Sequence, residues 1–116
     1  VEGRKKDLIN RGGEKISAEE VENLILSHPA VRNVACVPMP DPVLGERMCA
    51  YIIPRSGATL TLPELVGFLT EKGLAKFKLP ERVELVEEFP ISPFGKVSKL
   101  DLTKRIALKL QAEAKS

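Results

Sequence analysis

The stretch that decides the fold is Val31-Arg32-Asn33-Val34-Ala35-Cys36-Val37-Pro38-Met39, followed closely by Met48-Cys49-Ala50-Tyr51-Ile52-Ile53. The centre of each run is apolar at successive positions, which is typical of a strand buried on both faces rather than one that alternates. Pro38, Pro40 and Pro42 are expected to end the first strand and to place residues 40–45 in a loop. The two runs therefore predict the centre of a sheet.

The segments around this centre predict a hairpin, three helices and a further strand. Residues 8–16 indicate a hairpin that turns at Gly12-Gly13, because glycine supplies the positive φ of a tight turn. Helix starts are indicated at Ser17, Thr61 and Ser98 by residues of the capping-box type. Residues 83–86 alternate like a half-buried strand, and residues 112–116 are expected to fray. This order predicts an α+β domain with a small mixed or antiparallel sheet, an N-terminal hairpin and about three helices.

Length and composition exclude several classes of protein. The chain has 116 residues, 43% apolar and 29% charged, which predicts one folded domain rather than a disordered chain. A net charge of +2 is too balanced to indicate nucleic acid or an anionic membrane as a partner, and no apolar run approaches the ~20 residues of a membrane span. Two cysteines make no disulfide framework.

Few residues offer chemistry of their own. His28 is the only histidine, so no metal site is expected, and its place at a helix end favours a structural role. Cys36 and Cys49 lie in the two apolar runs, where small buried side chains are the favoured interpretation. Taken alone, Gly12-Gly13 is more typical of a hairpin turn than of a phosphate cradle.

Lys96 is the exception, because it follows Gly95 in a loop bracketed by Pro90 and Pro93. An ammonium on such a loop can reach a phosphate or a carboxylate. The spacing alone still favours an ordinary surface lysine.

Two long motifs change this balance. Residues 3–16, Gly3-Arg4-Lys5-Lys6-Asp7-Leu8-Ile9-Asn10-Arg11-Gly12-Gly13-Glu14-Lys15-Ile16, and residues 90–99, Pro90-Ile91-Ser92-Pro93-Phe94-Gly95-Lys96-Val97-Ser98-Lys99, resemble two signature segments of adenylate-forming enzymes. These are the acyl-CoA synthetases, the adenylation domains of peptide synthetases, and luciferase. The resemblance runs from residue 3 to about 105, and residues 9–15 are most similar to aryl-acid ligases of the 2,3-dihydroxybenzoate-AMP type.

The resemblance implies a two-step ligase. A carboxylate attacks the α-phosphate of ATP, bound with Mg²⁺, to give an acyl-adenylate and pyrophosphate. A thiol, of CoA or of a carrier protein's phosphopantetheine, then accepts the acyl group. In this family a small C-terminal domain rotates between the two steps, and residues 1–116 look like that mobile domain.

The resemblance also assigns roles to five residues. Lys96 matches the catalytic lysine of adenylation, and Lys6 matches the hinge. Arg4 is expected near the nucleotide ribose. Gly13 lies on the hairpin of the thioester step, where a side chain would obstruct the thiol's tunnel. Lys15 follows on that hairpin and is expected at the active-site or thiol-donor side.

The family's phosphate-binding loop and its ribose-binding Asp segment have no match in the chain. Both belong to an N-terminal domain, which would be the chief partner and would end just before Gly3, so these 116 residues alone are expected to adenylate nothing. The requirement for ATP and a thiol, with no targeting segment, predicts a cytoplasmic enzyme. The alternative function is a free-standing, non-catalytic binding module with a basic N-terminal hairpin, and nucleic-acid binding ranks lower still.

Overall fold

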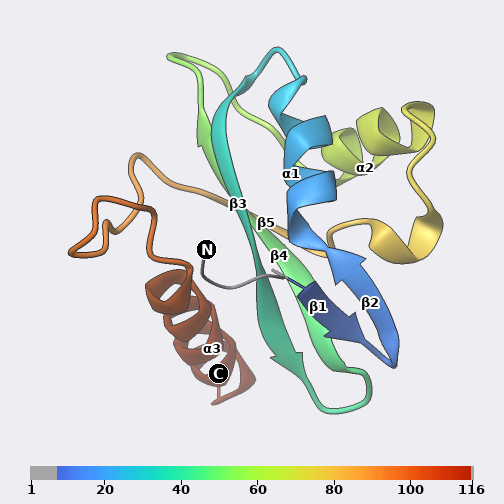
Figure 1. Cartoon of the computed structure of the whole chain (residues 1–116), viewed down its shortest axis with the longest axis vertical. Coiled ribbons are helices and arrows are strands. Elements are labelled where there is room, and N and C mark those ends of the chain that lie inside the picture. Colours follow the sequence, from blue (N-terminus) through green and yellow to red (C-terminus); the bar gives the residue numbers. More distant parts are fainter. Residues whose placement is uncertain (1–7, 116) are drawn as a thin grey trace.

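The computed structural model describes residues 8–115 and contains one sheet with helices on both of its faces (Figure 1). The predicted order of hairpin, helix, two strands, helix, strand and helix is confirmed, and a short 3₁₀ turn adds to it. The elements are β1 (Leu8–Arg11), β2 (Glu14–Ser17), α1 (Ala18–Leu26), β3 (Val31–Asp41), β4 (Gly45–Pro54), α2 (Leu62–Glu71), η1 (Lys76–Lys78), β5 (Arg82–Leu85) and α3 (Lys99–Lys115).

The sheet is built around β4. On one side β4 pairs antiparallel with β3 along its whole length, from Val31↔Pro54 to Asp41↔Gly45. On the other side it pairs in parallel with β5 over residues 49–52 and meets β1 at Arg11↔Gly45, and β1 in turn pairs with β2. The sheet is therefore mixed, as the sequence predicts, but β3 is an edge strand and not a central one.

The prolines of β3 do not end the strand, so the predicted break before residue 40 is wrong. Cys36 directs its N–H away from β4, toward Glu22 of α1. Pro38 and Pro40 lie two and four residues further along the strand, so their nitrogen atoms face the same side as that of Cys36. Proline has no backbone N–H, but at these positions the nitrogen faces the open edge of the sheet, so no hydrogen bond between β3 and β4 is lost. Only Pro42 lies in the turn that follows Asp41.

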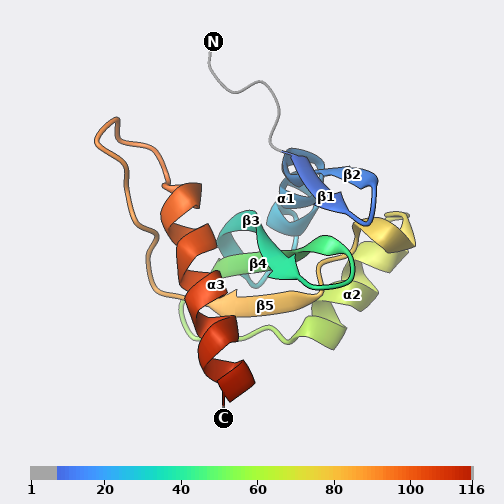
Figure 2. The same ribbon diagram turned by 90° about the horizontal axis from the view of Figure 1, so that it is seen from below.

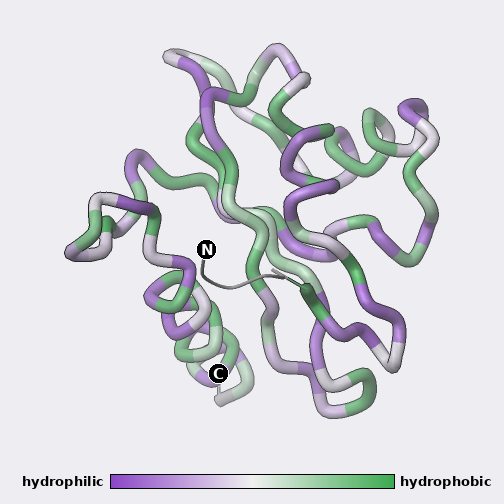
Figure 3. Tube along the Cα trace, viewed as in Figure 1, coloured by the Kyte–Doolittle hydropathy of each residue, from purple (hydrophilic) through white to green (hydrophobic). Residues whose placement is uncertain are grey.

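Two hydrophobic cores lie on opposite faces of the sheet. The face toward α1 and α2 carries Cys36, Met48, Ala50 and Ile52, and the hairpin contributes Ile9 and Ile16 to it. The other face packs against Leu102 and Ile106 of α3 and carries Ala35, Val37, Cys49, Tyr51 and Ile53. Figure 2 shows α3 alone on its side of the sheet, and Figure 3 shows β3 and β4 as the hydrophobic centre. Cys36 and Cys49 are both buried, as predicted, and they point to different cores.

The predicted helix starts are confirmed. The Oγ of Ser17 accepts from Glu20 N, Thr61 and Glu64 form a complete capping box, and Ser98 Oγ accepts from Asp101 N. Residues 112–115, which are expected to fray, are helical, because α3 continues to Lys115, and Ser116 lies outside the described residues. Arg82 of β5 donates two hydrogen bonds to Glu113, at 3.1 and 2.5 Å, and this bidentate pair holds the last turns of the helix on the sheet.

Candidate functional site

The hairpin turn is built for glycine. Gly12 and Gly13 have φ values of +58° and +93°, and Asn10 Oδ1 accepts a hydrogen bond from Gly13 N at 3.1 Å. Two successive residues with positive φ define the tight turn that matches the twist of the flanking strands. The Gly-Gly pair therefore makes a sharp and exposed tip.

The hairpin is fixed to the turn between β3 and β4. Gly12 N donates to Leu44 O at 2.8 Å, and Asn10 N donates to Glu46 Oε1 at 2.8 Å. A Cβ on Gly12 would lie 2.9 Å from Leu44 Cδ2, whereas a Cβ on Gly13 would meet nothing within 4 Å. At Gly12 the positive φ favours glycine and a side chain would displace the end of Leu44, while Gly13 faces open space.

Arg11 continues the attachment on the far side of the hairpin. Its guanidinium donates two hydrogen bonds to Glu81, at 3.0 and 3.1 Å, and Arg47 lies 3.5 Å from the same carboxylate. The hydrogen bond to Glu81 raises the pKa of Arg11. Hydrogen bonds from Leu44 N and Val43 N, together with nearby Arg47, lower the pKa of Asp41. The base of the hairpin is therefore held by charges that stay ionised at neutral pH.

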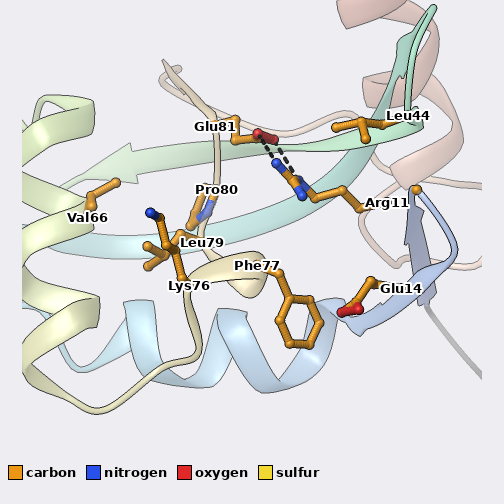
Figure 4. Close-up of a pocket in the computed structure, with 10 residues that line it drawn as sticks. Arg11, Glu14, Leu44, Val66, Lys76, Phe77, Leu79, Pro80 and Glu81 are labelled. Carbon is orange, nitrogen blue, oxygen red and sulfur yellow. Dashed lines mark hydrogen bonds and ion pairs between the residues drawn. The ribbon is translucent and has the colours of Figure 1, made fainter.

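A cavity of about 690 Å³ opens beside the hairpin (Figure 4). Its walls come from the hairpin, from α2 and from residues 76–81, and they combine apolar side chains with one exposed ammonium. The lining residues are Arg11, Gly12, Glu14, Leu44, Val66, Lys76, Phe77, Leu79, Pro80 and Glu81. A cavity with apolar walls and a few charged groups is the usual form of a small-molecule site.

Lys96 lies on a different part of the molecule, in the loop between β5 and α3. The loop folds back on itself through an Ile91↔Val97 bridge, a Ser92 N to Lys96 O bond of 2.7 Å and a turn at Gly95, where φ is +82°. Lys96 is exposed, and its ammonium makes no ion pair or hydrogen bond with any residue that the structure describes. Phe94, at the same tip, is 87% exposed.

The base of this loop is anchored on the sheet. Phe89 is 7% exposed within the core under α3, and Ser98 N donates to Pro90 O at 2.8 Å. Just beyond the loop, Lys99 Nζ lies 2.6 Å from Glu22 Oε2 of α1. An exposed tip on a fixed base can present a lysine to a second molecule or domain without losing its position.

The structure separates the predicted site residues into two groups. Gly13 and Lys15 lie on the hairpin, which packs with the α1 and α2 core, whereas the base of the Lys96 loop packs with the α3 core. Both views of the ribbon show the loop and the hairpin on different sides of the sheet (Figures 1 and 2). Lys15 is exposed on β2, opposite Asn10. Arg4 and Lys6 lie outside the described residues.

Sequence reasoning gave Glu22 no role and missed Glu81 and the cavity beside the hairpin. Glu81 lies 70 residues from its partner Arg11, so no local sequence pattern could predict the pair. Across residues 8–115 there is no group of three or more His, Cys, Asp or Glu side chains that could hold a metal ion. Over the same residues no helix has the length and apolar character needed to cross a membrane.

The structure is thus a three-layered α+β domain with a lysine loop on one side of the sheet and a Gly-Gly hairpin on the other. The sequence model of the AMP-binding enzyme C-terminal domain matches residues 20–96, which is more than half of the chain. The chain belongs to this family.

Individual relatives narrow the comparison. The chain is 59% identical over 112 residues to the 2,3-dihydroxybenzoate-AMP ligase of Bacillus subtilis, covering 97% of this chain and 21% of the relative. It is 49% identical to enterobactin synthase component E of Escherichia coli, covering 97% and 20%. The solved apo structure of Mycobacterium smegmatis MbtA superposes with a TM-score of 0.82 at 36% identity, covering 89% of this chain and 19% of that one. The chain thus spans about a fifth of the length of these relatives.

Proposed function

We propose that this chain is the mobile C-terminal domain of an ATP-dependent aryl-acid AMP ligase, which adenylates a carboxylate and transfers it to a thiol. One observation carries the proposal: an unpaired lysine loop and a glycine hairpin lie on different sides of one sheet. A single folded unit cannot bring both to the same reacting atoms at once. Presenting them in turn requires the domain to move between two steps.

In the first step the carboxylate oxygen attacks the α-phosphorus of ATP and pyrophosphate leaves. Lys96 supplies a positive charge where negative charge develops, between the carboxylate and the phosphate oxygens. Its exposed ammonium, which no described residue neutralises, is suited to this role. The Mg²⁺ that accompanies ATP is assigned to the N-terminal domain.

In the second step a thiol attacks the acyl-adenylate and AMP leaves. The hairpin would then face the active site, with the open space at Gly13 leaving room for the arm of CoA or of a carrier-protein phosphopantetheine. Lys15 and the cavity beside the hairpin lie on this side of the domain, so we assign them to the acceptor.

Lys6 is proposed as the hinge and Arg4 as a contact to the nucleotide ribose. The N-terminal domain is then the principal partner, and it supplies the acid pocket. An aryl acid of the 2,3-dihydroxybenzoate class is favoured because relatives at 59% and 49% identity are named for 2,3-dihydroxybenzoate and enterobactin. ATP and thiol chemistry place the enzyme in the cytoplasm in this proposal.

A non-catalytic module with a basic hairpin is the less favoured function. Arg11, the central basic residue of that hairpin, is already engaged by Glu81 through two hydrogen bonds. It is therefore not free to recruit an acidic partner.

The test is Lys96→Ala in a full-length ligase that carries this domain, with Lys104→Ala as the matched control. Lys104 is also exposed and lies on α3. We expect Lys96→Ala to lower ATP–pyrophosphate exchange by about 100-fold or more, while thiol transfer from preformed acyl-adenylate stays close to that of the parent enzyme. The proposal is wrong if both half-reactions fall equally or if exchange survives.

A further inference from the structure

One carboxylate ties together three elements at the open edge of the sheet. Glu22 Oε2 accepts a hydrogen bond from Cys36 N of β3 at 2.8 Å, and Lys99 Nζ of α3 lies 2.6 Å from the same oxygen. The side chains of Glu22 and Lys99 are 17% and 28% exposed. At this distance and burial, Lys99 and Glu22 form an ion pair in a partly desolvated setting.

The position of Glu22 follows from the topology. Because β3 is the edge strand, the Cys36 N–H that faces away from β4 needs an acceptor from outside the sheet. Glu22 provides it from α1, which covers one face, while Lys99 approaches from α3 on the other face. The carboxylate therefore joins the two helix layers across the edge of β3.

This junction lies directly at the base of the lysine loop. Lys99 is the first residue of α3, three positions after Lys96. Within residues 90–98 the loop is held mainly by its own bonds, which fix its shape. Where that shape lies on the sheet depends on its two ends, and the second end is held by the burial of Leu102 and by the Lys99 contact with Glu22.

We propose that Glu22 is a positioning residue for Lys96. By holding Lys99, it fixes the first turn of α3 and so sets where the Lys96 ammonium is presented during adenylation. The inference rests on the proposed function, because it gives Lys96 its role in the first step only. Glu22 and Lys99 touch no reactant in this proposal.

The required precision gives the expected size of the effect. A displacement of about 1 Å in a reacting group can cost ~100-fold in rate. Loosening one end of the lysine loop while the other end stays fixed should lower the rate by less than this. We therefore expect a loss of about tenfold in adenylation kcat. KM for ATP should change little, because the ATP site belongs to the N-terminal domain.

The test compares Glu22→Gln, Lys99→Met, the double variant and Lys99→Arg in the full-length ligase. Glu22→Gln keeps an oxygen for Cys36 N but removes the charge that holds Lys99. The matched control is Glu20→Gln, since Glu20 lies on the same helix and pairs with Lys78 at 3.0 Å. Exchange of ATP with pyrophosphate and transfer from preformed acyl-adenylate are measured for each variant, together with hydrogen exchange of the Cys36 amide.

The expected result is a loss of adenylation kcat in Glu22→Gln and Lys99→Met, no loss in the double variant beyond that of Lys99→Met, and near-parent rates in Lys99→Arg and Glu20→Gln. Thiol transfer and protection of the Cys36 amide should persist in Glu22→Gln. With Lys96→Ala impaired in adenylation only, unchanged adenylation in Glu22→Gln would overturn the inference, as would equal loss of both half-reactions. Unimpaired adenylation in Lys96→Ala would instead overturn the proposed function and this inference with it.

Discussion

At the scale of single residues, the two glycines of the hairpin have different reasons to be glycine. Gly12 has a φ of +58°, and a Cβ there would lie 2.9 Å from Leu44 Cδ2, so a side chain would have to displace the end of Leu44 within this domain. Gly13 has a φ of +93° but meets no atom within 4 Å. A side chain there would therefore project from the domain, toward whatever the hairpin faces in the complete enzyme.

This difference predicts a selective effect of Gly13→Asn. Asparagine tolerates positive φ better than most residues, so the strain should stay near ~1 kcal/mol. In the full-length ligase we expect thiol transfer to slow by about tenfold, because the new side chain enters the path of the acceptor arm, with adenylation little changed. Rates of the two half-reactions check this.

Gly57→Asn is the matched control for this prediction. Gly57 also has a positive φ, +77°, and a Cβ there would meet nothing within 4 Å, but it lies in the turn after β4. It should reproduce the strain without the kinetic effect. Equal slowing of thiol transfer by both substitutions would assign the effect to stability and not to the acceptor path.

At the scale of elements, α3 is held on β5 by a network of charges. Arg82 donates to Glu84 at 2.6 Å and to Glu113, and Lys109 donates to Glu84 at 2.6 Å. Burial opposes ionisation of Glu84, but hydrogen bonds from Lys109 and Arg82 outweigh it and lower its pKa below the ordinary 4.5. The hydrogen bond from Arg82 likewise lowers the pKa of Glu113.

The lowered pKa of Glu84 predicts how this network responds to acid. A carboxyl group whose pKa is lower in the folded state stabilises that state above its unfolded pKa, and this contribution disappears as pH falls through the folded pKa. Glu84→Gln should therefore lower the free energy of unfolding by about 1–2 kcal/mol at pH 7. The difference from the parent chain should shrink as pH falls below 4.5.

Urea unfolding of the 116-residue chain at a series of pH values measures this. Glu88→Gln serves as the control, because Glu88 is exposed and its side chain makes no hydrogen bond or ion pair with the other described residues. A Glu84→Gln effect that is constant across the whole pH range would show that charge does not cause it.

Local patterns predicted most of the elements but not how they are joined. The capping residues, the Gly-Gly turn and the apolar runs each depend on neighbours in sequence, and they placed nearly every helix and strand. The prolines of β3 led to a wrong strand end. A proline removes a sheet hydrogen bond only where its nitrogen faces a neighbouring strand, and that depends on the strand order. The contact that holds the end of α3 was missed for a similar reason, since Glu113 pairs with Arg82, 31 residues away.

The candidate site divides in the same way. The hairpin and the lysine loop were found from contiguous motifs, whereas Glu22, Glu81 and the cavity wall at Phe77 come from segments that only folding brings to them. Position along the chain identifies the groups that would act. The contacts that hold those groups in place appear only in three dimensions.

At the scale of the whole molecule, two cores on opposite faces of one sheet predict a domain that folds on its own. Both cores use β3 and β4, so neither can be lost without exposing the other. Tyr51 is the only tyrosine, there is no Trp, and its side chain is 4% exposed in the core under α3. Its fluorescence therefore reports that core, whereas far-UV circular dichroism reports the helices on both faces.

The two signals should change together in urea, as expected for a cooperative unit of this size. Separate midpoints would show that the layer of α3 unfolds independently of the rest. The measurement also decides whether stability changes in single variants can be interpreted as two-state free energies.

A folded domain need not be a catalyst. The positions of the charged side chains in this domain predict that it has no adenylating activity by itself. The Lys96 ammonium lies on an exposed tip, and the cavity beside the hairpin is lined by none of the residues of that tip. A single exposed charge neither binds ATP nor aligns a carboxylate with its α-phosphorus, and that alignment provides a large part of the rate. The 116-residue chain, incubated with Mg²⁺, labelled ATP and 2,3-dihydroxybenzoate, should therefore form no acyl-adenylate, whereas a full-length ligase carrying the same domain should form it readily. Formation of adenylate by the chain alone, abolished by Lys96→Ala, would show that the domain holds a complete nucleotide site and would contradict the division of labour proposed here.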